Sequence, residues 1–154
     1  MAPIWTKGRG LLGPLKPLIG EWVSVPEEQI SHMPMRCARS LRALGKGWIE
    51  LNAHWEMPTG DAYREIALFG AAADGVLGFY SFTSDGKRSE GRLAGGADIH
   101  PSALAFEAQM PAGLARMVYW PLEEGAGLQF AVESRTQKGW GRFLKQIYRP
   151  AARS

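Results

Sequence analysis

The 154-residue chain has a single cysteine, Cys37, which excludes an intrachain disulfide and any zinc site built from several thiolates. It also lacks an apolar run approaching the roughly 20 residues of a membrane-spanning helix. No long apolar core follows the positive charges near its start, as it would in a secretory signal. We therefore expect a cytoplasmic protein in a reducing compartment, without membrane insertion.

The chain also lacks a large excess of charge of one sign. Eighteen Lys and Arg residues against fifteen Asp and Glu give a net charge of +3, and the basic residues are scattered along the chain. This balance gives no reason to expect nucleic acid or an acidic membrane as a partner. With 45% hydrophobic and 21% charged residues, the composition is typical of a folded protein. The length fits one domain over residues 1–154, with 1–10 a candidate for disorder.

Motifs of familiar catalytic sites are absent too. The sequence contains no Gly-x-Ser-x-Gly elbow, no Gly-rich phosphate loop and no His-Glu-x-x-His helix. Its histidines, His32, His54 and His100, have no further ligands at supportive spacing, so we expect neither a metal nor a cofactor. A reactive pair of Cys37 and His54 is disfavoured, because the strand register proposed below places them on opposite faces. Cys37 is expected to be a buried apolar cysteine.

Turn signals do recur from residue 45 onward, at intervals of roughly 10 to 15 residues that suit antiparallel hairpins. Asp74-Gly75 and Asp85-Gly86 are the strongest, because Asp-Gly favours a two-residue type I′ turn. A short helix is expected at 26–30, where proline precedes two glutamates. The predicted strands cover residues 18–24, 35–44, 48–56, 62–70, 76–83, 87–94, 103–110, 114–121, 128–135 and 140–149.

Residues 35–44 also carry apolar side chains at helical spacing, and strand register resolves the ambiguity. With Gly45-Lys46-Gly47 as a three-residue loop, apolar residues face each other on one side of the hairpin and opposite charges on the other. The predicted pairs are Leu41–Leu51, Ala43–Ile49 and Cys37–Trp55 on the apolar face, and Arg42–Glu50 and Arg36–Glu56 on the charged face. About ten strands with almost no helix would leave two exposed sheet edges, which closure removes. The predicted fold class is therefore all-β, a closed antiparallel barrel with a short helix near one mouth.

The segment Leu15-Lys16-Pro17-Leu18-Ile19-Gly20-Glu21-Trp22 resembles the opening strand of lipocalin-like barrels, whose Gly-x-Trp closes the barrel base. The later hairpins and the terminal Ile147-Tyr148-Arg149 are similar to a bacterial group of lipocalin-like proteins of unknown function. These proteins are of the calycin type, relatives of nitrobindins and fatty-acid-binding proteins. The resemblance covers residues 11 to 150 and implies that an arginine of the last strand, here Arg142, packs on Trp22.

Two features of those relatives are not matched. Fatty-acid-binding proteins carry Arg-x-Tyr on the final strand to hold a carboxylate, whereas Gln146-Ile147-Tyr148 keeps the tyrosine and lacks the arginine. Nitrobindins bind haem through a late histidine, and every histidine here precedes the last strand. The resemblance therefore implies neither haem nor the carboxylate clamp of the fatty-acid-binding type.

Strand alternation sorts side chains into the interior and the exterior of a barrel. On the last four predicted strands the even-numbered positions carry the apolar residues, so we expect these positions to face inward, Arg116 and Arg142 included. The charged row 88, 90 and 92 marks an outer face, which turns Tyr80 and Phe82 inward. Arg39 lies on the apolar face of its strand. The predicted ligand-binding residues are Arg39, Glu65, Tyr80, Phe82, Phe106, Arg116, Trp120, Phe130, Gln146 and Tyr148.

An apolar cavity with a few convergent polar groups is how small-molecule sites are generally built. The sequence thus predicts a barrel that binds a small apolar molecule with an acidic or polar end. Arg116 is the predicted charged contact, since no structural partner for it is evident. In the structural alternative Arg142 seals the base against Trp22, Arg39 pairs with Glu65, and Arg116 reaches solvent.

Two other classes of function stay open. One is an enzyme, such as an isomerase or cyclase, that uses Glu65, Tyr80 or Tyr148 in the same cavity as acid or base. The other is a self-associating interaction protein, a homodimer for example, whose barrel is filled by its own side chains. Met117 and Tyr119 would then be among the anchors on its outer face.

Overall fold

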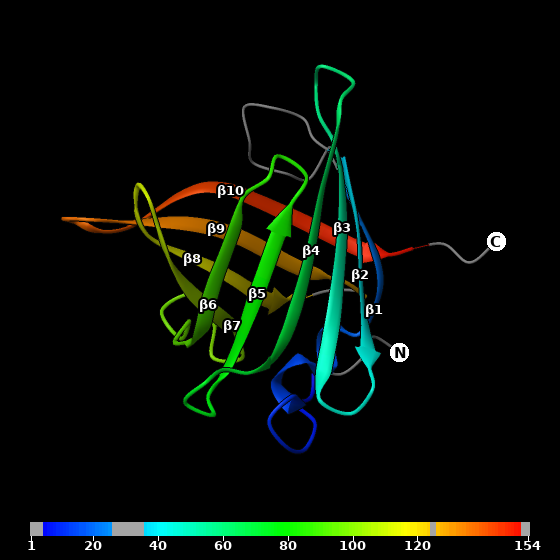
Figure 1. Ribbon diagram of the computed structural model, residues 1–154, viewed down its shortest axis with the longest axis vertical. Coiled ribbons are helices and arrows are strands. Elements are labelled where there is room, and N and C mark those ends of the chain that lie inside the picture. Colours follow the sequence, from blue (N-terminus) through cyan, green and yellow to red (C-terminus); the bar gives the residue numbers. More distant parts are fainter. Residues whose placement is uncertain (1–4, 26–35, 124–125, 152–154) are drawn as a thin grey trace.

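The structure, a computed structural model, describes residues 5–25, 36–123 and 126–151. Ten antiparallel strands in these ranges close into one barrel, in which each strand pairs with its neighbours in sequence and β1 meets β10 (Figure 1). The predicted all-β closed barrel is confirmed. The strands are β1 (Gly20–Ser24), β2 (Arg36–Leu44), β3 (Trp48–Glu56), β4 (Ala62–Ala71), β5 (Leu77–Thr83), β6 (Arg88–Ala94), β7 (Leu104–Met110), β8 (Gly113–Pro121), β9 (Leu128–Thr136) and β10 (Gly139–Pro150).

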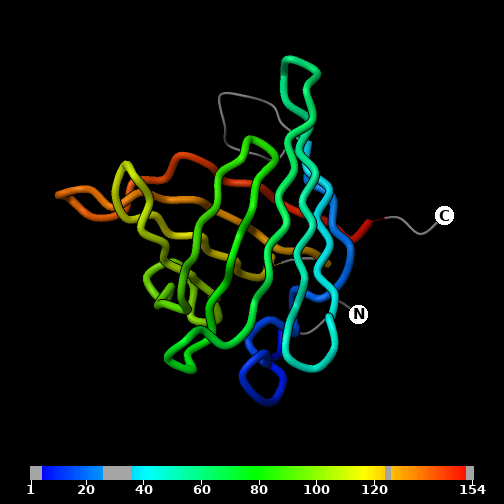
Figure 2. Tube along the Cα trace, in the orientation of Figure 1, coloured from blue at the N-terminus to red at the C-terminus, as the bar shows by residue number. Residues whose placement is uncertain are grey.

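One end of the barrel is plugged by a short 3-10 helix, η1 (Gly13–Leu18), in which Leu15 and Leu18 are fully buried in the main core. The chain trace shows η1 and the β2–β3 loop at this end, and the β3–β4 and β5–β6 loops at the other (Figure 2). The sequence predicted a strand from residue 18, whereas β1 begins at Gly20. The helix predicted at 26–30 lies outside the described residues. Within them, no helix is long and apolar enough to cross a membrane.

The β2–β3 hairpin follows the predicted register in full. Leu44 lies opposite Trp48, so the connecting loop has three residues, and all five predicted pairs are present. Cys37 is buried and His54 is exposed, which confirms the prediction that they lie on opposite faces of the hairpin. The agreement arises because one register satisfies both the apolar face and the charged face.

The predicted two-residue Asp-Gly turns are wrong. In the β5–β6 loop the Gly86 N–H donates to the Thr83 carbonyl (3.0 Å) and the Thr83 N–H to the Lys87 carbonyl (2.9 Å), so three residues form the loop. Asp74-Gly75 sits in a loop of the same kind. A type I′ turn needs positive φ at both central residues, but only glycines among the described residues have it. The aspartates therefore keep ordinary φ and the glycine alone takes the left-handed position.

This extra loop residue moves two predicted site residues to the outside of the barrel. Phe82 pairs with Arg88 and Tyr80 with Glu90, so both aromatic side chains share the outer face of the charged row. They are 51% and 37% exposed. The odd-numbered Leu77, Phe79 and Ser81 of β5 are buried instead. A one-residue change of register turns every side chain to the other face, and that is the cause of the error.

On β8 the inward positions are odd-numbered, contrary to the prediction. Met117 pairs with Phe106, and Tyr119 lies opposite Phe130, so neither is an outer anchor. The loop between Met110 and Gly113 has two residues, which joins even positions of β7 to odd positions of β8. Arg116, Val118 and Trp120 consequently face outward.

A second register shift affects β10. Its pairing with β9 slips between Arg142 and Leu144, and the resulting bulge reverses the alternation. Leu144, Gln146 and Tyr148 are buried as predicted, whereas Arg142 lies on the outer face, where it contacts Glu133 and Trp120. The prediction that Arg142 packs on Trp22 is therefore wrong. The Trp22 indole instead donates a hydrogen bond to the Leu18 carbonyl (2.9 Å), which ties β1 to η1.

Candidate functional site

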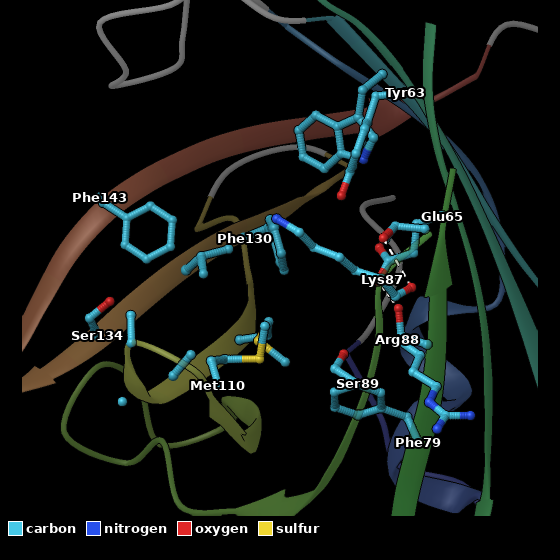
Figure 3. A pocket seen from close by; sticks show the side chains of 18 of the residues that line it. Tyr63, Glu65, Phe79, Lys87, Arg88, Ser89, Met110, Phe130, Ser134 and Phe143 are labelled. Carbon is cyan, nitrogen blue, oxygen red and sulfur yellow. Dashed lines mark hydrogen bonds between the residues drawn. The ribbon is translucent and has the colours of Figure 1, made fainter. Parts of the chain in front are cut away.

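A cavity of about 420 Å³ lies in the barrel toward the end opposite η1 (Figure 3). Phe130, Met110 and Phe143 form one side of it, and Glu65 and Phe79 the other. Its size falls in the range of pockets that hold small molecules. A barrel filled by its own side chains, one of the sequence-based alternatives, is not what the structure shows. The large apolar lining residues are Trp55, Tyr63, Phe79, Met110, Met117, Phe130, Val132 and Phe143.

The cavity ends on an aromatic core. Phe69, Phe79 and Phe106 pack with ring centroids 5.1 to 5.8 Å apart, in tilted and edge-on arrangements that favour aromatic pairs. A narrow extension of about 40 Å³ reaches between these rings and Arg39. The three rings and η1 fill the end of the barrel that η1 plugs. A ligand therefore has access from the other end, where the β3–β4 and β5–β6 loops lie (Figure 2).

Arg39 is the buried cation of this cavity. It projects from β2, is 3% exposed, and its guanidinium lies 4.4 Å from the Phe130 ring centroid. The Nη1 group donates to the Tyr119 hydroxyl (2.5 Å), while Nε has no hydrogen-bond partner. Burial acts to lower the pKa of Arg39, but Tyr119 and Tyr148 oppose it and the net pKa is raised, so the side chain stays charged. Aromatic faces stabilise such a cation, yet they do not neutralise it.

The predicted ion pair of Arg39 with Glu65 is not formed. Among the described residues, no carboxylate lies within ion-pair distance of Arg39. Glu65 Oε2 instead accepts a hydrogen bond from the Ser81 hydroxyl (2.6 Å), and both side chains line the cavity. The site thus holds one buried cation and one hydrogen-bonded carboxylate without direct contact between them.

Gln146 and Tyr148 are inside the barrel but fully buried, and they do not line the cavity. The Tyr148 hydroxyl donates to Gln146 Oε1 (2.7 Å), and its ring lies 5.4 Å from the Arg39 guanidinium carbon. Burial raises the pKa of Tyr148, of Tyr119 and of the Cys37 thiol. These groups stay protonated at neutral pH, so they form the packing behind Arg39 rather than a base or a nucleophile.

The predicted site residues divide into three groups. Arg39, Glu65 and Phe130 line the main cavity, and Phe106 lines its narrow extension. Tyr148 packs against Arg39 and donates a hydrogen bond to Gln146, and neither of the two lines the cavity. Tyr80, Phe82, Arg116 and Trp120 lie on the outer face. Trp55, Tyr63, Ser81 and Met117 also line the cavity but are not among the predicted ligand-binding residues, although strand alternation predicts an inward Tyr63. Trp55 could have been predicted, because its predicted strand partner Cys37 lies on the inward face and paired residues share a face.

Arg116 lies on the outer face of the barrel, where neighbouring side chains bury it. Its Nη1 and Nη2 groups each lie 2.9 Å from an oxygen of Asp98, and Nε donates to Glu133 Oε1 (3.0 Å). The guanidinium also lies 4.5 Å from the Trp140 ring centroid. Asp98 belongs to the β6–β7 connection, so Arg116 fastens this connection to the barrel wall. The prediction that Arg116 is an inward residue awaiting a ligand, or one that reaches solvent, is wrong.

We expect this outer contact to weaken in acid. The hydrogen bonds from Arg116 lower the pKa of Asp98 below its ordinary value of 3.8. Because the folded pKa is the lower one, the ionised carboxylate adds stability above the unfolded pKa, and this stability is lost as the pH falls through the folded pKa. Asp98→Asn should cost roughly 1 kcal/mol or less at pH 7, since more than half of the carboxylate side chain is exposed.

The measurement is the free energy of unfolding in urea for both proteins between pH 7 and pH 3. The difference between wild type and Asp98→Asn should shrink as the pH is lowered below about 4. A difference that stays constant over this range would show that Arg116 does not depend on the Asp98 charge.

In a comparison with known proteins, no family model and no curated protein matches the chain. Within the described ranges, His, Cys, Asp and Glu side chains form no group suited to a metal ion. The class that fold and cavity define is a closed antiparallel β-barrel with an aromatic-lined interior cavity.

Proposed function

We propose that the barrel binds a small, largely apolar molecule with an acidic end, and that Arg39 contacts the acid. The observation that carries this proposal is the buried Arg39 guanidinium beside the cavity, without a carboxylate partner among the described residues. A buried charge without a direct ion-pair partner is costly, and an anionic ligand in contact with Arg39 would supply that partner. The lipocalin-like resemblance of the sequence agrees with such a role.

The rest of the lining supports a ligand with an apolar body. Trp55, Phe79 and Phe130 offer flat aromatic surface, and Met110 and Met117 are flexible enough to adapt to its shape. Glu65 adds an acceptor on the same cavity wall, which suits a hydroxyl or amine donor on the ligand. Lys87 lines the cavity and adds positive charge along the route of an entering anion (Figure 3).

The test compares carboxylic acids with their primary amides, because each pair differs in charge and little in shape. Acids that bind should raise the melting temperature of the protein, since a ligand of the folded state stabilises it. By calorimetry we expect an acid to bind at least about tenfold more tightly than its amide, from a charge-assisted hydrogen bond.

The control is Ala115→Phe, which adds a ring to the cavity wall. It should remove binding of acids and amides alike if the ligand occupies the cavity. Equal affinity of acids and amides would refute the anion site, and binding that survives in Ala115→Phe would place the ligand elsewhere.

An enzymatic role would rest on Glu65. Of the three residues predicted as acid or base, Tyr80 lies outside the barrel and Tyr148 is sealed behind Arg39. The hydrogen bond from Ser81 (2.6 Å) holds the Glu65 carboxylate at the cavity wall, where it would accept a proton from a bound substrate. Glu65→Gln should then abolish any turnover of an identified ligand while leaving its binding measurable.

A further inference from the structure

The outer face of β4 and β5 carries an exposed apolar strip. Ile66 is 44% exposed, Phe82 51% and Tyr80 37%. The strand register makes them neighbours, with Ile66 opposite Phe82 and the partly buried Leu68 opposite Tyr80. Large apolar residues gathered on a barrel exterior, rather than scattered singly, mark a contact surface. We call these four residues the β4–β5 strip.

Charged residues flank the β4–β5 strip in a definite order. On β6, Arg88 lies opposite Phe82 and Glu90 lies opposite Tyr80. On β3, Glu50 lies opposite Leu68, at the same level as Glu90. The strip thus has a positive and a negative residue in succession on one side and a negative residue on the other.

We propose that the β4–β5 strip is the interface of a homodimer, with the two-fold axis in the plane of the interface and perpendicular to the strands. In a two-fold symmetric dimer the same surface of both subunits forms the interface. Each contact therefore occurs twice, with the roles of the two subunits exchanged. Centred between the two levels of the strip, this axis packs Phe82 on Tyr80 of the partner subunit. It also places Arg88 beside Glu90 of the partner subunit, twice per dimer.

The order of the charges selects this axis. A two-fold axis along the strands would exchange the β3 side of the strip with the β6 side, and Glu90 would face Glu50 of the partner subunit. Like charges brought together at an interface are unfavourable, whereas the perpendicular axis makes two opposite-charge contacts. The apolar strip and its charges are therefore complementary to a second copy of the same face.

A recess lies beside the protruding aromatic residues. A groove of about 470 Å³ runs along β6 next to the strip, and Phe82, Arg88 and Gln109 are among the residues that line it. On the proposed axis this groove faces the same groove of the partner subunit, beside the contact of Phe82 with Tyr80 of the partner subunit, and the paired Arg88 and Glu90 side chains lie in it. Aromatic residues and arginine are the side chains most enriched at the centre of such interfaces.

The first experiment measures the mass of the full-length protein in solution over a concentration series, by sedimentation equilibrium and light scattering. Wild type should form a dimer that dissociates on dilution. Phe82→Glu should raise the dimer dissociation constant at least about thirtyfold, the effect of losing a central interface residue. The control is Ile19→Glu, an exposed apolar residue that precedes β1 and lies outside both the strip and the cavity, which should leave the dissociation constant unchanged. Circular dichroism confirms that each variant is folded.

The second experiment exchanges the charges. Arg88→Glu and Glu90→Arg should each weaken the dimer, because each sets like charges together, and the double exchange should restore it. A wild type that stays monomeric at every concentration would overturn the proposal and leave the strip to a different partner. A dimer that Phe82→Glu does not weaken, or that the double exchange does not restore, would equally overturn it.

Discussion

Arg116→Met is expected to lower the free energy of unfolding by about 3 kcal/mol, although Arg116 touches no ligand cavity. The substitution removes both hydrogen bonds to Glu133, a side chain that is 5% exposed, and leaves a buried carboxylate with Arg142 as its remaining ion-pair partner. It also frees Asp98 and with it the β6–β7 connection. Removing one member of a buried ion pair is costly because the charge of the other member is still buried and has lost its partner.

Urea denaturation measures this effect, with Arg142→Met as the matched control. Arg142 binds the same carboxylate but is 36% exposed, so its loss should cost only about 1 kcal/mol. Arg116→Met combined with Glu133→Leu should recover part of the lost stability, since no buried carboxylate is then left uncompensated. Equal effects of Arg116→Met and Arg142→Met would contradict our account of this contact.

The β2–β3 hairpin shows what the sequence predicts well. Its loop contains three residues between strands whose charged and apolar positions match in only one register, so Leu41–Leu51 and Arg42–Glu50 could be assigned without a structure. Arg39 entered the candidate site by the same route. When polar and apolar residues alternate on both strands of a hairpin, the sequence alone shows which face is buried.

The β5–β6 hairpin shows where such reasoning fails. Asp85-Gly86 is compatible with loops of two or of three residues, and the flanking strand positions do not decide between them. Tyr80 and Phe82 are aromatic, as Phe79 is, so either register buries an aromatic ring. The choice was made by the backbone conformation of Asp85, which has no separate signature in the sequence.

On β8 the alternation itself is missing. Val118 and Trp120 face outward but are buried with Ala105 and Ala131, because Ile99 and Ala103 of the β6–β7 connection pack over them. A strand that is covered on both faces carries apolar residues at odd and even positions alike. The apolar even-numbered positions of β8 therefore predict an inward Arg116, which is wrong. Its partner Asp98 lies in the β6–β7 connection, and the path of such a connection cannot be predicted from a repeating sequence pattern.

Arg39→Met is expected to separate function from stability. If Arg39 contacts an acid, this variant should bind that acid roughly ten- to a hundredfold more weakly and bind the matching amide as before. The same substitution should leave the free energy of unfolding unchanged or raise it by about 1–4 kcal/mol, because an apolar side chain of similar length replaces a buried charge. The contacts with Phe130 and Tyr148 limit the gain, since aromatic rings already stabilise the cation.

Two further variants assign the effect to the charge. Arg39→Lys keeps a cation but loses the planar donors, so it should recover part of the acid affinity. Tyr119→Phe removes the hydroxyl that Arg39 Nη1 contacts, without removing the charge, and should weaken acid binding less than Arg39→Met does. A loss of stability in Arg39→Met with unchanged acid affinity would make Arg39 a structural residue. Lost affinity in a protein that is as stable or more so is the result expected if the costly buried charge of Arg39 is retained for its ligand.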